Sequence, residues 1–254
     1  MRKAYISIAA LLLCGSMLMA QTPANRTAKT TAADVLAQMP AAKQAAYNKL
    51  IGDLSSTGEE GVLMLVNMIN APGKGSNANV DYALSGLTHY VMAKGEENAR
   101  LVTAKAYLKA LEMVNERETK AFIIRQLQML GKDECIDVLA SYLNDESLSG
   151  PAARALASNG SQKAGQALVA ALKSRTGSSK TQKDVIRAIA DARVDGAEPV
   201  LLVLQGASDP NMQKEVLYAL SCVGSSNSLP VLAKAAENAG YTMEVTGANE
   251  AYIA

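Results

Sequence analysis

Apolar residues recur at helical spacing over most of the chain. From about residue 34 they follow one another three or four positions apart, and no stretch alternates between apolar and polar residues as a half-buried strand does. The pattern therefore predicts an all-α fold. We expect a leading helix over "ADVLAQM" to end at Pro40, because proline lacks the N–H that continues a helix.

Two columns of apolar residues repeat along the second half of the chain, each with separations of 29, 33 and 31 residues. The first column contains Leu127, Leu156, Ile189 and Leu220, and the second contains Leu139, Leu168, Leu201 and Leu232. Because both columns share one register, each unit is predicted to be a helical hairpin with an apolar stripe on both helices.

The expected joints between the paired helices also resemble one another. Glycine stands where the first helix should end, and where positive φ is often needed, at Gly131, Gly160 and Gly224. The third unit has Arg193 at this place. Pro199 and Pro230 fall in the predicted first turn of a second helix, and Asp209 is a predicted N-cap.

Looser hairpins are expected upstream, over residues 41–71 with "STGEEG" as the joint and over residues 79–114 with "KGEEN" as the joint. A single hairpin leaves one apolar side uncovered, so the units must stack on one another. We therefore expect about six stacked hairpins within residues 34–254, preceded by a flexible linker over residues 21–33. The final "TGANEAYIA" looks like the start of another apolar helix, which favours a natural protein that continues beyond Ala254.

Residues 116–239 resemble HEAT-like repeats of the short bacterial kind, which are related to PBS-lyase-type repeats. In that kind a first helix with a V-R-x-A motif ends in L-G and precedes a second helix with L-x-x-L. The matching segments run from Ile124-Arg125 to Gly131, from Ala153-Arg154 to Gly160, from Ile186-Arg187 to Arg193, and from Leu217-Tyr218 to Gly224. Tyr218 interrupts the arginine column.

The resemblance implies a right-handed α-solenoid, a curved superhelix of the armadillo type. It also implies a role in holding other proteins or in positioning another domain. Members share no common catalytic residues, so the resemblance assigns none to this chain. Similar arrays in secreted bacterial proteins often precede a β-sandwich domain that resembles sugar hydrolases.

Residues 1–20 have the three parts of a secretory signal: Arg2 and Lys3, an apolar run over residues 4–19, and a small residue at Ala20. We expect cleavage after Ala20 and a periplasmic location. Cys14 follows Leu13, whereas lipidated cysteines follow small residues, so lipoprotein anchoring is disfavoured. No later apolar run approaches the roughly 18–20 residues that a membrane span needs.

Composition narrows the classes of partner and chemistry. The 25 lysines and arginines and 24 acidic residues give a net charge of +1, so no basic field favours nucleic acid. Cys135 and Cys222, the two cysteines after the signal, are predicted to be buried free thiols. His89 is the only histidine, which disfavours a metal site or a Ser-His-Asp site, and we expect no cofactor.

Three other features have structural explanations. The segment "APGKGSNANVD" (71–81) fits neither a phosphate loop nor a calcium loop, and is predicted to be a flexible connection with Asn79 as the next N-cap. The acidic pairs 59–60, 96–97 and 133–134 should begin second helices, where the helix dipole favours negative charge. The basic stretch over residues 173–187 is predicted to be a solvated loop between repeats.

Carbohydrate binding is disfavoured, though it stays open, because sugar sites generally use exposed aromatic faces. The chain has no tryptophan and a single phenylalanine, Phe122. Tyr82, Tyr90 and Tyr107, near His89, form the one aromatic-rich surface candidate.

The leading hypothesis is a non-enzymatic scaffold that binds another protein, or a following domain, through an inner surface formed by its second helices. The candidate residues on that surface are Asp137, Tyr142, Gln166, Lys173, Gln205, Lys234 and Glu237. Two alternatives remain: the N-terminal repeat region of a sugar-active hydrolase, and a structural spacer without a ligand.

Overall fold

A computed structural model describes residues 26–93, 95–174 and 176–254. These residues form α-helices and one short 3₁₀ helix, and no β-strand occurs among them, so the all-α prediction is confirmed. The elements are α1 (Ala28–Ala37), α2 (Gln44–Ser55), α3 (Gly58–Asn67), α4 (Ala78–Val91), α5 (Glu97–Met113), α6 (Arg117–Leu130), η2 (Asp133–Cys135), α7 (Ile136–Ser141), α8 (Ser149–Asn159), α9 (Gln162–Ser174), α10 (Ser179–Asp191), α11 (Glu198–Leu202), α12 (Pro210–Val223), α13 (Leu229–Asn238) and α14 (Ala248–Ile253).

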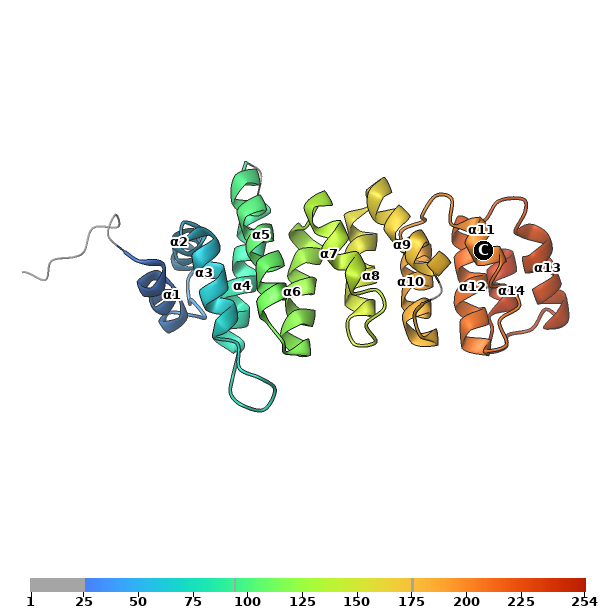
Figure 1. The fold of residues 1–254 in the computed structure, drawn as a ribbon, viewed down its shortest axis with the longest axis horizontal. Coiled ribbons are helices and arrows are strands. Elements are labelled where there is room, and N and C mark those ends of the chain that lie inside the picture. Colours follow the sequence, from blue (N-terminus) through green and yellow to red (C-terminus); the bar gives the residue numbers. More distant parts are fainter. Residues whose placement is uncertain (1–25, 94, 175) are drawn as a thin grey trace, which may run out of the picture.

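The helices lie in a row from α1 at one end to α13 and α14 at the other (Figure 1). Helices two places apart in the chain contact each other: α2, α4, α6, α8, α10, α12 and α14 form one line, and α1, α3 and α5 begin another. The second line continues through η2, α7, α9 and α11, and α13 contacts α12 and α14. The expected alternation of first and second helices is therefore present in the contacts.

Both repeated columns lie in the core. Every member of the first column is at most 1% exposed, and every member of the second is at most 5% exposed. The residues three positions before the first column, from Ile124 to Leu217, are buried as well. The predicted register is therefore confirmed, because each column faces a neighbouring helix rather than solvent.

The glycine joints differ in their physical reason. Gly160 follows α8 with φ 68°, as predicted. Gly131 and Gly224 have φ of −72° and −71°, so the prediction of positive φ is wrong for them. A Cβ atom on Gly131 would lie 2.6 Å from the Leu127 oxygen, and one on Gly224 would lie 2.3 Å from the Leu220 oxygen. Glycine is needed there for close approach rather than for backbone handedness.

Arg193 ends α10 in the left-handed conformation, with φ 48°. Its N–H donates to the Ala190 oxygen at 3.0 Å, and the Val194 N–H donates to the Ile189 oxygen at 3.1 Å, the two bonds of a Schellman motif. Glycine adopts this conformation more easily than arginine does, by roughly 1 kcal/mol. The third joint therefore shares the left-handed backbone of Gly160 but places a less favourable residue there.

The N-terminal linker prediction is wrong for residues 28–33, which belong to α1. Thr27 caps this helix, since its hydroxyl oxygen accepts a hydrogen bond from the Thr30 N–H at 3.2 Å. Thr31 and Ala32 are buried against the rest of the row. The predicted signal over residues 1–20, and residues 21–25 of the linker, lie outside the described residues.

The connection between α3 and α4 projects from the row (Figure 1). Asn77, rather than the predicted Asn79, precedes the first residue of α4. Asn77 and Asn70 close this connection, because Asn77 Oδ1 accepts from the Asn70 N–H at 2.8 Å and Asn77 Nδ2 donates to the Asn70 oxygen at 2.9 Å. Asn79 Nδ2 instead donates to the Leu36 oxygen of α1 at 3.3 Å.

The loop predicted over residues 173–187 is wrong for residues 179–187, which belong to α10, but three other predicted helix starts are confirmed. Pro199 and Pro230 lie in the first turns of α11 and α13, and Asp209 Oδ1 accepts from the Asn211 N–H at 3.0 Å at the start of α12. The final helix expected in "TGANEAYIA" is α14, which contacts α12 and α13. None of the described helices combines the length and the apolar character needed to cross a bilayer.

Replacing Leu168 with alanine tests the packing. Leu168 is fully buried on α9, so Leu168→Ala should lower the free energy of unfolding by about 2–5 kcal/mol. Lys173→Ala, an exposed change on the same helix, is the control and should lie within about 0.5 kcal/mol of the parent. Equal urea unfolding curves for the two variants would contradict the packing described above.

Candidate functional site

The structure leaves most of the predicted surface residues exposed but does not gather them into one site. Tyr142 is the exception, being half-buried with Lys120 Nζ 5.4 Å from its ring centre. The exposed members are Asp137, Gln166, Lys173, Gln205, Lys234 and Glu237. Asp137 pairs with Lys163 of the next hairpin at 3.1 Å, and Lys234 pairs with Glu237 on its own helix at 2.7 Å.

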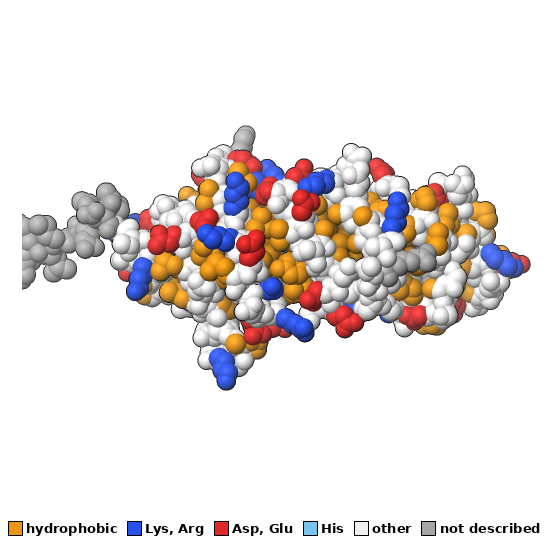
Figure 2. Space-filling view, in the orientation of Figure 1, with side chains coloured by type: hydrophobic (Ala, Val, Ile, Leu, Met, Phe, Trp, Pro, Cys, Tyr) orange, Lys and Arg blue, Asp and Glu red, His pale blue; other side chains and the backbone are white. Residues whose placement is uncertain are grey.

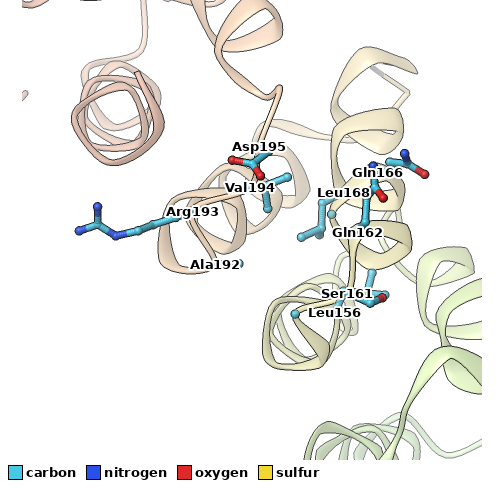
Figure 3. Close-up of a pocket in the computed structure, with 11 residues that line it drawn as sticks. Leu156, Ser161, Gln162, Gln166, Leu168, Ala192, Arg193, Val194 and Asp195 are labelled. Carbon is cyan, nitrogen blue, oxygen red and sulfur yellow. The ribbon is translucent and has the colours of Figure 1, made fainter. Parts of the chain in front are cut away.

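Gln166, a member of that set, lines a substantial pocket. The pocket has a volume of about 560 Å³ and lies between α9 and the α10–α11 joint. Figure 3 shows Gln162 and Gln166 of α9 on one side, and Val194 and Asp195 of the joint on the other. We call it the joint pocket.

The first wall of the joint pocket follows from the turn between α8 and α9. The left-handed Gly160 reverses the chain, and the Ser161 hydroxyl then accepts from the Ala164 N–H at 3.3 Å at the start of α9. Gln162 and Gln166 are one helical turn apart and both exposed, whereas Leu168 points into the core. The two amides therefore stand side by side on the exposed face of α9.

The second wall follows from the turn at Arg193. That turn buries Val194 and leaves Asp195 exposed beside it. A Cβ atom on Gly165 would lie 2.9 Å from Val194 Cγ1, so glycine at this position lets the joint approach α9 closely. The sequence predicted that Gly160 and Arg193 each follow the first helix of a hairpin. No sequence pattern predicted that position 165 must be glycine for the α10–α11 joint to approach α9.

The chemistry of the joint pocket suits binding. Each glutamine amide both donates and accepts hydrogen bonds, and the Asp195 carboxylate accepts them. The lining contains neither a histidine nor a cysteine. The arrangement can therefore recognise groups that present N–H and C=O together, as a polypeptide backbone does.

The face of the row shown in Figure 2 has a consistent pattern. Over the part of the row from α7 to α12, hydrophobic side chains run along the middle of the face in Figure 2. Lysine, arginine and acidic side chains gather toward its upper and lower edges. A partner lying along this face would meet apolar contacts in the middle and charges at the margins.

An ion cluster joins α5 to the next helices around the buried Arg100, which is 4% exposed. Arg100 Nη1 donates to the Leu130 oxygen at 2.7 Å and to Glu134 Oε1 at 2.6 Å, and Arg100 Nε donates to Glu97 Oε1 at 3.1 Å. Lys132 Nζ donates to Glu97 Oε2 at 2.9 Å. The predicted acidic helix starts are confirmed, but their role in holding Arg100 was missed.

The pKa shifts in this cluster follow from the same bonds. Hydrogen bonds from Arg100 and Lys132 lower the pKa of Glu97 to about 2. Burial acts to raise the pKa of Glu134, but hydrogen bonds from Arg100 and backbone N–H groups outweigh it and the pKa is lowered. Burial raises the pKa of the neighbouring Cys135 thiol to about 12, which keeps it protonated and unreactive.

The remaining candidates do not form a reactive site. His89 is exposed on α4, and the described residues contain no group of three or more His, Cys, Asp or Glu side chains that could hold a metal. Tyr107 is fully buried and donates to the Leu84 oxygen at 3.1 Å, so the predicted tyrosine surface is wrong at this position. Cys135 is a buried free thiol, as expected, whereas Cys222 is only half-buried.

Models of known protein families gave no match to this chain, and neither did the curated proteins.

Arg100→Ala should lower the free energy of unfolding at pH 7 by about 2–3 kcal/mol, because it leaves the half-buried Glu134 carboxylate and the Leu130 oxygen without their partner. Lys105→Ala, an exposed change on the same helix, is the control and should have little effect. Urea unfolding of the three proteins at pH 7 measures the difference.

The pH dependence gives a second readout. The folded-state pKa values of Glu97 and Glu134 are lowered, so their stabilisation is present above the ordinary value of 4.5 and is lost as pH falls toward about 2. The parent should therefore lose more stability between pH 5 and pH 2.5 than Arg100→Ala does. If the free energy of unfolding of the two proteins falls in parallel over this pH range, the ion pairs of Arg100 do not stabilise the fold.

Proposed function

We propose that this protein is a HEAT-like α-solenoid that binds another protein and carries no catalytic activity of its own. The observation that supports this most is the burial of two residue columns, spaced by 29, 33 and 31 residues, between helices that contact each other two places apart. An array of this kind provides a long continuous surface rather than a single enclosed cleft.

The joint pocket indicates how part of that surface would bind. An extended segment of a partner presents backbone N–H and C=O groups along its length. Gln162 and Gln166 can pair with both, and Asp195 can accept from N–H groups. Hydrophobic side chains along the middle of the face in Figure 2 could bury apolar side chains of a partner.

We also propose that the protein acts in the periplasm, with a partner that is another secreted protein or a following domain. This part rests on the pattern of residues 1–20, where Arg2 and Lys3 precede the apolar run and Ala20 ends it. The near-neutral charge gives no support for a nucleic-acid partner.

Affinity capture with the full chain tests this function. Extract from the source cells is passed over the parent, over Gln162→Ala/Gln166→Ala, and over the control Gln44→Ala/Asn48→Ala. The control pair also lies one turn apart on an exposed helix face, and its amides bond only to each other, at 2.8 Å. Retained proteins are quantified by mass spectrometry.

We expect a partner protein that the parent and the control retain equally. The Gln162→Ala/Gln166→Ala variant should retain about tenfold less of it, because the variant loses one to two hydrogen bonds to the partner. Equal capture by all three would remove the joint pocket from the binding surface. Capture of nothing above background would favour a spacer.

A further inference from the structure

A second pocket, of about 650 Å³, lies between α10, α12 and the last residues of the chain, 243–254. We call it the C-terminal pocket. Its volume falls within the range of roughly 300–1,000 Å³ that is typical of ligand sites. Its lining combines charged side chains, such as Lys214 and Glu250, with apolar ones, such as Met243.

Some charged side chains in the C-terminal pocket are already engaged by neighbouring groups. Arg187 Nε lies 3.2 Å from Glu215 Oε2, and the Arg187 guanidinium stacks over the Tyr218 ring at 4.5 Å. The Glu244 carboxylate accepts from the Thr246 and Ala248 N–H groups at 2.8 and 3.1 Å at the start of α14. These groups hold the pocket together.

Four charged side chains of the lining have no ion-pair partner among the described residues: Arg193, Lys214, Glu244 and Glu250. All four are exposed. The two cations can bind a carboxylate, whereas the two carboxylates beside them disfavour a dianion such as phosphate, because they would repel its second charge. An arginine can bind a carboxylate through two parallel hydrogen bonds.

An apolar side completes the lining. Met243 is 87% exposed, Tyr218 is 37% exposed, and Cys222 is half-buried next to them. A methionine side chain adapts its shape to different apolar partners. The pocket can therefore hold a carboxylate and an apolar group of the same ligand.

The conformation of Arg193 also supports a ligand site in the C-terminal pocket. Figure 3 shows its side chain directed away from the joint pocket, toward the neighbouring helix. Its left-handed backbone would be more stable with glycine, the residue that adopts this conformation at position 160. A guanidinium that binds a ligand would offset this unfavourable backbone.

We propose that the C-terminal pocket binds a peptide segment with an acidic residue next to an apolar one. The acidic side chain lies against Arg193 and Lys214, the apolar side chain lies against Met243 and Tyr218, and Glu250 accepts a hydrogen bond from a peptide N–H. This inference adds a chemically defined second site to the protein-binding function proposed above, and it rests on that function.

The test uses the full chain and an array of acetylated, amidated hexapeptides in which acidic and apolar positions are varied independently. We expect the retained peptides to have an acidic residue adjacent to an apolar one, and fluorescence anisotropy with the strongest of them gives the affinity. Arg193→Gln and Lys214→Gln should each weaken binding about tenfold or more, since each removes a charge-assisted hydrogen bond.

Arg154→Gln is the matched control, because Arg154 is an exposed arginine of α8 that lies outside the C-terminal pocket. It should leave the affinity unchanged. Retention without an acidic–apolar preference, or equal weakening by Arg154→Gln, would overturn the proposal. Displacement of the peptide by dodecanoate at equal concentration would overturn it in favour of a fatty-acid site.

Arg193→Gly separates a binding role from a folding role. Glycine relieves the left-handed backbone, so the variant should raise Tm by about 2–4 °C while it weakens peptide binding about tenfold. A rise in Tm with unchanged binding would remove Arg193 from the site. If no peptide binds but a partner protein is captured in a way that depends on Gln162 and Gln166, only the proposal for the C-terminal pocket is overturned. If no peptide binds and no partner is captured, the proposed function is overturned as well.

Discussion

Burial of apolar helix faces between successive hairpins is the constraint on which the rest of the structure depends. Leu156 and Leu168 belong to one hairpin, and neither could be fully buried by that hairpin alone, because each helix has an apolar side that faces the next unit. The row must therefore continue from helix to helix. Stacking fixes the spacing of the helices, and the spacing fixes where the joints between them can lie.

The joints between paired helices differ from one hairpin to the next, both in the residue that ends the first helix and in the polar contacts around it. Gly131 and Gly224 are needed because a Cβ atom would collide with the carbonyl one turn earlier, whereas Gly160 and Arg193 make a left-handed turn. Polar contacts across the joints also vary: the arginine-centred cluster of α5 has no equivalent at α11, where the Glu198 carboxylate instead accepts from Ser225 and Ser228. The need to bury apolar faces between hairpins therefore keeps the apolar columns alike, while the residues at the joints can vary.

The sequence predicted the helices and the buried apolar columns, because both depend on the periodicity of apolar residues. Leu127 and Leu139 were placed correctly because burial repeats with the helical period and with the unit, and both periods are visible in one dimension. Arg100 and Tyr107 were missed because their burial depends on single partners on other helices, the Leu130 and Leu84 oxygens. Asn77 was missed because two asparagines near one helix start can each act as a cap, and only the contact with the opposite end of the loop decides between them.

The turn at Arg193 links the two pockets and explains why they lie so close together. Its backbone sets Val194 and Asp195 against α9 and so forms one wall of the joint pocket, while its side chain reaches the C-terminal pocket beside α12. A glycine would form the first wall equally well but would contribute nothing to the second. The residue at this joint is therefore proposed to carry two separable roles, one in the backbone and one in the side chain, and recognition in this protein is expected to reside in its joints rather than in its repeated stripes.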